Sequence, residues 1–166
     1  MIAAAALAVA ALLMLVEQQR SLRHERLLRQ RGASEPPDDV YRAMAWVYPA
    51  AFIVMAVEGW WRGAPRSSVL LAGLVLFAAA KALKYWAIAS LGERWTFRVL
   101  VPPQSPRVTN GPYRWLRHPN YVAVIGELLG FAVLAGAPVA GGTVILVFLR
   151  LIWRRIDVEE AALRGT

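Results

Sequence analysis

Long apolar runs separated by short polar segments dominate the chain. The runs 2–16, 41–61 and 68–91 each predict an apolar helix, and a fourth run covers 121–150. The fourth run is overlong for one helix and contains glycines and a proline at 136–142, so we expect a hairpin of two antiparallel helices there. Since a helix needs about 20 apolar residues to cross a bilayer, the pattern predicts an all-α integral membrane protein with about five transmembrane helices.

The first run is short for a membrane span. It can cross a bilayer only if the polar residues at 17–19 lie at the interface. A secretory signal is the alternative, but such a signal carries its basic residues before the apolar core, whereas here the arginines follow it. We therefore expect a retained first helix. Arginines at helical spacing within 20–29 then predict a surface helix that the glycine and prolines of 32–37 stop.

Composition and charge agree with a membrane protein. The chain is 58% hydrophobic, with a mean hydropathy of +0.43 and a net charge of +8. Six arginines lie in 17–42, five in 92–119 and four from Arg150 onwards, against two in 62–67 and none at the hairpin tip. By the positive-inside rule, the Arg-rich segments and the charged amphipathic tail 153–166 are cytoplasmic and the N-terminus is outside, as in a bacterial inner-membrane protein. Arginines between spans indicate anionic headgroups as partners rather than nucleic acid.

The chain has no cysteine and only two histidines, His24 and His118. Disulfides, thiolate metal sites and a cysteine nucleophile are therefore excluded. A multi-histidine metal site is not expected either, so we predict no metal. The length predicts a single domain over 1–166.

Some charged residues lie within the apolar runs. Lys81 and Lys84 share one helix face and either snorkel to the interface or point into the bundle. Glu127 is almost two turns into its run, too deep to reach water easily, so we expect it to pair with Lys81 or Lys84. Glu58, beside the interfacial Trp60, can simply face the headgroups.

The densest polar segment, 111–121, directly precedes the fourth apolar run. Polar groups this dense at a membrane boundary are costly to desolvate. The hairpin places this segment beside the tail, where Arg155 and Glu159 share a helix face. Simpler alternatives stay open: His118 can cap a helix or face solvent, Tyr121 can anchor the chain at the interface, and the tail can carry only weak ion pairs.

Three stretches carry a more specific signal. They are Leu91-Gly-Glu-Arg-Trp-Thr-Phe-Arg-Val, Gly111-Pro-Tyr-Arg-Trp-Leu-Arg-His-Pro-Asn-Tyr and, after the hairpin, Arg155-Ile-Asp-Val-Glu-Glu-Ala-Ala-Leu. Together they resemble the isoprenylcysteine carboxyl methyltransferase family over about residues 80–166, with the GPYR-xx-RHP-xY core as the most specific part. The resemblance implies a catalytic core in 68–166, completed by N-terminal helices in 1–67.

The resemblance also implies an activity. It is S-adenosylmethionine-dependent methyl transfer in the membrane to an oxygen, carboxylate or hydroxyl, of a lipophilic acceptor. The cofactor would lie between the polar segment and the C-terminal tail. Family members usually continue past the Glu-Glu pair with an aromatic stretch that helps to close the site, whereas this sequence stops six residues after Glu160, which predicts a truncated or compact form. The implied cofactor-binding residues are His118, Tyr121, Tyr113, Arg117, Glu159 and Glu160, and the implied catalytic residues are Arg155, His118 and Arg154.

The chemistry of these residue types agrees with that assignment. Aromatic faces suit a sulfonium cation, and arginine and glutamate suit a carboxylate and ribose hydroxyls respectively. The sequence has no Gly-x-Gly-x-x-Gly, so a Rossmann sheet is not expected. A carboxylate acceptor needs no general base, whereas a hydroxyl would need one, for which His118 is the obvious candidate. We expect Arg154 or Arg155 to orient an anionic acceptor whose lipid tail lies between the third and fourth spans.

Other functions stay open from the sequence. A phospholipid N-methyltransferase and an NADPH-dependent sterol-type reductase share related architecture, and the reductase also carries an Arg-His-Pro-x-Tyr run. A non-enzymatic transporter subunit or scaffold is a further alternative, although the internal repeats typical of transporters are absent. Within the methyltransferase reading, the acceptor is either a prenylated protein or a lipophilic small molecule of the polyketide type.

Overall fold

The computed structural model describes residues 2–37, 40–103 and 108–164. These residues form five α-helices and two short 3-10 helices, η1 (Gly92–Arg94) and η2 (Gly111–Arg114), and contain no strand. The prediction of an all-α protein is therefore confirmed. The α-helices are α1 (Ile2–Gln30), α2 (Tyr41–Arg62), α3 (Ser67–Leu91), α4 (Pro119–Ala135) and α5 (Pro138–Arg164).

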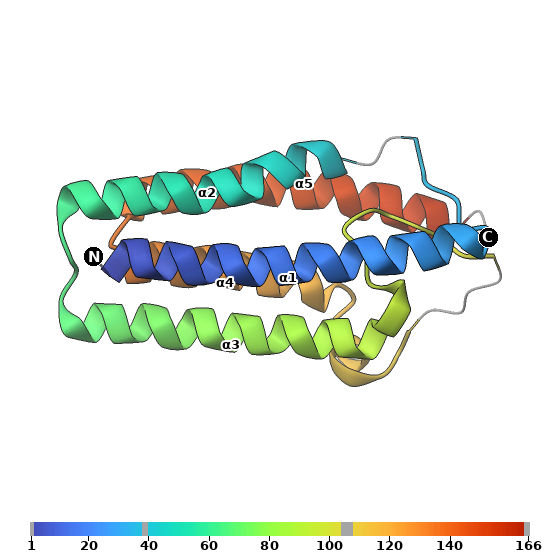
Figure 1. The fold of residues 1–166 in the computed structure, drawn as a ribbon, viewed down its shortest axis with the longest axis horizontal. Coiled ribbons are helices and arrows are strands. Elements are labelled where there is room, and N and C mark those ends of the chain that lie inside the picture. Colours follow the sequence, from blue (N-terminus) through green and yellow to red (C-terminus); the bar gives the residue numbers. More distant parts are fainter. Residues whose placement is uncertain (1, 38–39, 104–107, 165–166) are drawn as a thin grey trace.

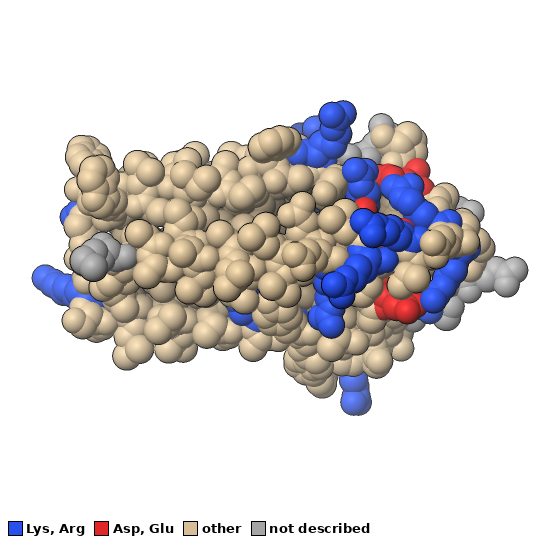
Figure 2. Space-filling model, in the orientation of Figure 1, with Lys and Arg blue, Asp and Glu red and all other residues tan. Residues whose placement is uncertain are grey.

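The five helices lie along the long axis of the molecule and successive helices run in opposite directions (Figure 1). The N-terminus therefore lies at one end, while the last turns of α5 lie at the other with the end of α1 and the connections around η1 and η2. By length and composition, α1, α2 and α3 are long and apolar enough to cross a membrane, and α4 is a shorter apolar helix. Most of the Lys and Arg visible in Figure 2 gather at the end that holds the connections, as the sequence predicts.

Helix α1 differs from the expected short span followed by a surface helix. It is one helix of 29 residues, about 43 Å long. Its arginines are exposed, but Glu17 is only 2% exposed and lies inside the bundle instead of at the interface. Glu17, Ser21 and Glu25, four residues apart, form a buried polar stripe on one face of the helix. This face turns inward because its polar groups find partners there, on α3 for Glu17 and in segment 97–98 for Ser21 and Glu25.

Glu17 belongs to an interior ion cluster, which also contains Lys81, Lys84 and Glu127. Lys81 Nζ lies 2.7 Å from Glu17 Oε1 and 3.0 Å from Glu127 Oε2. Lys84 Nζ lies 2.7 Å from Glu17 Oε2 and 3.4 Å from Glu127 Oε1, and Tyr48 donates a hydrogen bond to Glu127. The expected pairing of Glu127 is confirmed, with both lysines. The two lysines thus point into the bundle, where two carboxylates offset the cost of burying them.

Helices α3 and α4 share the most extensive helix–helix contact among the described residues. Gly73 of α3 faces the backbone of Leu134, and Gly130 of α4 faces the backbone of Phe77; a Cβ at either glycine would overlap those atoms. Small residues at such an interface let two helix backbones touch, as is common between membrane helices. This contact holds α4 against α3. Because the polar segment 111–121 leads into α4, the contact also helps to position that segment.

The connection between α4 and α5 is short. Gly136 ends α4 in the left-handed conformation, which glycine adopts without strain, and Pro138 begins α5. Glu58 of α2 accepts hydrogen bonds from the backbone N–H groups of Val139 and Ala140, at 3.3 and 2.6 Å. The side chain of Glu58 therefore stabilises the first turn of α5 rather than simply facing headgroups.

Candidate active site

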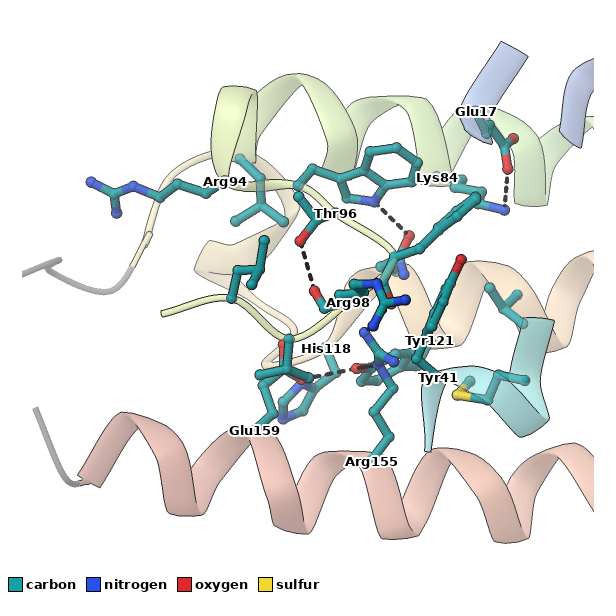
Figure 3. A pocket seen from close by; sticks show the side chains of 18 of the residues that line it. Glu17, Tyr41, Lys84, Arg94, Thr96, Arg98, His118, Tyr121, Arg155 and Glu159 are labelled. Carbon is teal, nitrogen blue, oxygen red and sulfur yellow. Dashed lines mark hydrogen bonds and ion pairs between the residues drawn. The ribbon is translucent and has the colours of Figure 1, made fainter. Parts of the chain in front are cut away.

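A cavity of about 740 Å³ opens at the end of the bundle that holds the connections (Figure 3). Its walls come from α1, α2, the end of α3, the segment 94–102, residues before and in the first turns of α4, and the middle and end of α5. One part is polar and is formed by the residues that the sequence singled out. Another part is apolar and includes Met14 and Leu15 of α1, Met44 and Pro49 of α2, and Phe148 of α5.

The Gly-Pro-Tyr-Arg sequence forms η2, which leads into this cavity. Gly111 has φ +56°, and a Cβ there would overlap the side chain of Ser90 on α3, so only glycine lets η2 pack this close to α3. Pro112 is buried in the turn. Tyr113 and Arg117, which follow, line the cavity. Local geometry therefore explains the Gly-Pro that begins the motif.

Tyr121, Arg155 and Glu159 are joined by hydrogen bonds at the polar wall of the cavity (Figure 3). Arg155 Nε donates to the Tyr121 hydroxyl at 2.9 Å, and this hydroxyl donates to Glu159 Oε2, also at 2.9 Å. Arg155 is buried, so its charge-assisted hydrogen bonds hold it in one orientation. The phenol thus connects the first turn of α4 to two successive turns of α5.

His118 completes this group, which we call the mouth cluster: His118, Tyr121, Arg155, Glu159 and Glu160. The imidazole stacks on the Tyr121 ring with centroids 5.5 Å apart. Its Nδ1 lies 3.6 Å from Glu159 Oε2 and its Nε2 lies 3.7 Å from Glu160 Oε1. His118 is the N-cap residue of α4 but its side chain makes no capping hydrogen bond. The expected meeting of His118 and Glu159 across the two helices is confirmed.

Tyr113 lies on the same side of the cavity. Burial raises the pKa of its phenol well above the ordinary value, and the negative charge of Glu159 raises it further. Tyr113 therefore stays a neutral hydrogen-bonding group at physiological pH and offers an aromatic face and a hydroxyl to a ligand.

The segment 95–98, part of the stretch 91–99 that carries the family resemblance, forms another wall of the cavity, a role that the sequence analysis did not assign to it. Arg155 donates a hydrogen bond to the carbonyl of Phe97. Arg98 Nη1 lies 2.6 Å from Glu35 Oε1 and its guanidinium lies 4.5 Å from the centre of the Tyr41 ring. This segment has no helical or strand periodicity to identify it. The signal that could have found it is the polar stripe on α1, since buried polar groups there require partners.

Two expectations about the site change. Arg154 is exposed, and the described residues that line the cavity do not include it, whereas Arg155, one residue on, does line it. Helices α3 and α4 touch through their backbones at Gly73 and Gly130, so the space expected between these two spans for an acceptor's lipid tail is closed at those positions. The apolar wall of the cavity comes from α1, α2 and α5 instead.

The fold and this cavity define a class: a small helical bundle with helices long and apolar enough to cross a membrane and a polar, charged cavity at one end. The profile of the isoprenylcysteine carboxyl methyltransferase (ICMT) family matches residues 71–165, and the chain belongs to this family. The resemblance drawn from the sequence motifs is thereby confirmed. As a member of this family, the chain is a membrane methyltransferase.

Relatives are found in bacteria and plants. The uncharacterized protein YpbQ of Bacillus subtilis (strain 168) is 30% identical over 141 residues, which cover 85% of this chain and 84% of YpbQ. An uncharacterized protein of Haemophilus influenzae is 25% identical over 144 residues, or 86% of this chain and 84% of that protein. A probable protein-S-isoprenylcysteine O-methyltransferase of Oryza sativa subsp. japonica is 30% identical over 94 residues, or 55% of this chain and 49% of that protein. No solved structure matches the chain.

Proposed function

We propose that this protein is an S-adenosylmethionine-dependent O-methyltransferase that acts on a lipophilic acceptor at the cytoplasmic side of a bacterial inner membrane. The observation that carries the proposal is the cavity, in which the mouth cluster and an apolar wall from α1, α2 and α5 share one space. A methyl donor that is polar and an acceptor that is lipophilic need these two environments side by side.

The residues present fit the proposed cofactor. The cavity volume of about 740 Å³ lies within the roughly 300–1,000 Å³ usual for small-molecule sites. The aromatic faces of Tyr113 and Tyr121 suit a sulfonium cation, and Arg117 suits the carboxylate of its amino-acid part. Glu159 and Glu160 suit the ribose hydroxyls and the ammonium group. When bound, S-adenosylmethionine supplies an electrophilic methyl group.

The chain's own contribution is positioning. The hydrogen bonds from Arg155 to Tyr121 and from Tyr121 to Glu159 fix the polar wall before any ligand arrives. Arg155 also presents positive charge to the cavity, which favours an acceptor oxygen that is already anionic. A carboxylate acceptor needs no proton removed. A hydroxyl acceptor would pass its proton to the imidazole of His118, which Glu159 and Glu160 flank.

The proposed membrane placement has five crossings, α1 to α5, with the cavity end in the cytoplasm. The gathering of arginines at that end in Figure 2 supports this orientation. An acceptor in the inner leaflet would then reach the apolar wall formed by α1 and α2. The acceptor class is a lipophilic small molecule or a prenylated chain.

Calorimetric titration of the purified protein in detergent tests the cofactor. We expect heat on addition of S-adenosylmethionine and none on addition of NADPH. Heat with NADPH alone would overturn the proposal in favour of a reductase. The matched control is the Glu159→Gln/Glu160→Gln variant, which loses two carboxylates of the mouth cluster and is expected to bind the cofactor weakly.

Incubation of membranes with methyl-labelled cofactor tests the reaction. We expect label in the lipid or protein fraction only when the chain is present. Alkaline treatment then identifies the bond, since a methyl ester releases labelled methanol whereas an ether or N-methyl group keeps the label. Alkali-stable label on a phospholipid amine would replace O-methylation with N-methylation.

A further inference from the structure

We infer that Ser21 and His24 of α1 are positioning residues of the proposed cofactor site, acting through the backbone of segment 95–98. Helix α1 lies outside the residues matched to the family, 71–165. This inference rests on the proposed function. It adds two residues to that function. They hold the wall formed by segment 95–98 in place from α1, whereas the mouth cluster contacts this segment through Arg155.

Ser21 is fully buried and its hydroxyl is used twice. It donates a hydrogen bond to Glu25 Oε1 at 2.8 Å, one turn further along α1. It accepts a hydrogen bond from the backbone N–H of Phe97, also at 2.8 Å. Because its proton points to Glu25, its lone pairs are left to receive the Phe97 N–H. The orientation of this serine is therefore set by its own helix.

Phe97 is held at both of its backbone polar groups. Its N–H is bound by Ser21, and its carbonyl accepts a hydrogen bond from the guanidinium of Arg155. Arg155 in turn donates to Tyr121, and Tyr121 to Glu159. A continuous chain of hydrogen bonds thus runs from Ser21 of α1 across the cavity wall to Glu159 of the mouth cluster.

His24 makes a parallel connection one turn further along the same face of α1. Its Nδ1 lies 2.8 Å from the carbonyl oxygen of Trp95, and since a carbonyl can only accept, Nδ1 carries the proton. Trp95 is buried, and its indole N–H donates to Asn120 Oδ1 at 3.3 Å. Segment 95–98 is thereby fixed between α1 and the first turn of α4.

Packing alone does not require these polar groups. An apolar helix face would bury α1 at lower desolvation cost, because each buried hydroxyl or imidazole must find a partner. The partners found here are backbone groups of segment 95–98. This segment lies outside any helix or strand, so its backbone N–H and C=O groups have no regular backbone hydrogen bonds. Trp95, Thr96, Phe97 and Arg98 all line the cavity, so fixing this backbone fixes the wall that a ligand contacts (Figure 3).

The test compares variants that remove one hydrogen bond with variants that keep it. Ser21→Ala removes the acceptor for the Phe97 N–H, and His24→Leu removes the donor to Trp95. His24→Gln keeps a side-chain donor, and Ser68→Ala is the control, since Ser68 is exposed on the first turn of α3 at the far end of the bundle. Each variant is measured by calorimetry with S-adenosylmethionine, and by hydrogen–deuterium exchange of peptides covering 95–98 without cofactor.

We expect Ser21→Ala and His24→Leu each to weaken cofactor binding about tenfold, the factor that one hydrogen bond is worth. Exchange in 95–98 should become faster in both, even without cofactor. His24→Gln should restore most of the affinity, and Ser68→Ala should match the wild type. Unchanged affinity and unchanged exchange in Ser21→Ala and His24→Leu, with a wild type that binds, would overturn the inference and leave the proposed function intact. A wild type that does not bind S-adenosylmethionine would instead overturn the proposed function, and the inference with it.

Discussion

The protein contains two charged clusters that differ in how completely they are closed. In the interior ion cluster, Glu17 and Glu127 each contact both lysines, and the exposed fraction of every side chain is 8% or less. In the mouth cluster, the side chains of His118, Glu159 and Glu160 are 24–36% exposed, and the imidazole nitrogens lie 3.6 and 3.7 Å from the carboxylates. The interior charges are fully paired, whereas those at the mouth leave room for another molecule.

Because of this difference, we expect the interior ion cluster to affect the stability of the protein and the mouth cluster to affect its function. Two lysines and two glutamates in contact are formally neutral together, and their pairing offsets the cost of burying these charges where α1, α3 and α4 meet. The looser mouth cluster lines the cavity, as a binding site must. Glu17 and Lys84 belong to the interior cluster and also touch the cavity wall. Both clusters therefore border the same cavity, and variants in each should separate their roles.

The largest effect is expected from breaking the interior ion cluster. Glu127→Leu leaves two buried lysines facing one carboxylate, and Tyr48 loses its acceptor. Removing one partner of a buried ion pair costs about 3–5 kcal/mol because the other charge stays buried. We expect this loss in the free energy of unfolding, measured by denaturant titration in detergent micelles.

A paired variant sharpens that result. Lys81→Met combined with Glu127→Leu removes one charge of each sign and leaves Lys84 with Glu17, which are 2.7 Å apart. The double variant should recover most of the lost stability. If it is as unstable as Glu127→Leu, the cost arises from packing around Glu127 and not from an unpaired charge.

The next largest effect is expected at the mouth, on activity rather than on stability. Arg155→Ala removes the hydrogen bonds to Tyr121 and to the Phe97 carbonyl, so the polar wall loses its fixed geometry. We expect methyl transfer from labelled cofactor to fall by about a hundredfold, the scale of a small misplacement of reacting groups. Thermal unfolding should show a folded protein.

Arg150→Ala is the matched control for Arg155→Ala. Arg150 is exposed on α5, and the cavity-lining residues that the structure describes do not include it. Its loss should leave the rate of methyl transfer at the wild-type level. Full activity in Arg155→Ala would remove that residue from the site.

The sequence predicted those parts of the fold that depend on local composition. The runs 41–61 and 68–91 match α2 and α3 closely, because an apolar run of this length forms a helix in a bilayer wherever it lies in the chain. Glu127 was expected to pair with a lysine because its depth leaves few other choices. The mouth cluster was expected because the predicted hairpin brings segment 111–121 beside the tail, and because the GPYR-xx-RHP-xY core and the Glu-Glu pair resemble the family.

The sequence could not predict parts that depend on distant partners. Glu17 directly follows the apolar run 2–16, and from the sequence a charge there fits the membrane interface as well as the bundle interior. It lies in the interior because Lys81 and Lys84, on another helix, pair with it there. The segment 95–98 has no periodicity, and its backbone is fixed by Ser21 and by Arg155, far away on either side in the sequence. Such contacts belong to the tertiary structure alone.

The smallest effect is expected at the surface, where a third charged group tests the same relation between burial and energy. Glu35 accepts hydrogen bonds from Arg98 and Arg29. Partial burial acts to raise the pKa of the Glu35 carboxyl, but the hydrogen bonds and charges of the two arginines outweigh it and hold the pKa below its usual value. Glu35→Gln should lower the free energy of unfolding by less than about 1 kcal/mol at neutral pH, because such pairs are solvated and screened.

The pH dependence of the stability difference between wild type and Glu35→Gln shows whether the charged Glu35 carboxylate stabilises or destabilises the folded protein. A carboxyl with a lowered pKa in the folded state stabilises the protein above its unfolded pKa, and this stability is lost as the pH falls through the folded pKa. The difference between wild type and Glu35→Gln, measured by thermal unfolding in detergent, should therefore be largest at neutral pH and vanish in acid. Glu93→Gln, in the more exposed pair with Arg31, should change stability less. A Glu35→Gln effect as large as that of Glu127→Leu would contradict the view that burial, and not the number of ion pairs, separates the charged groups of this protein.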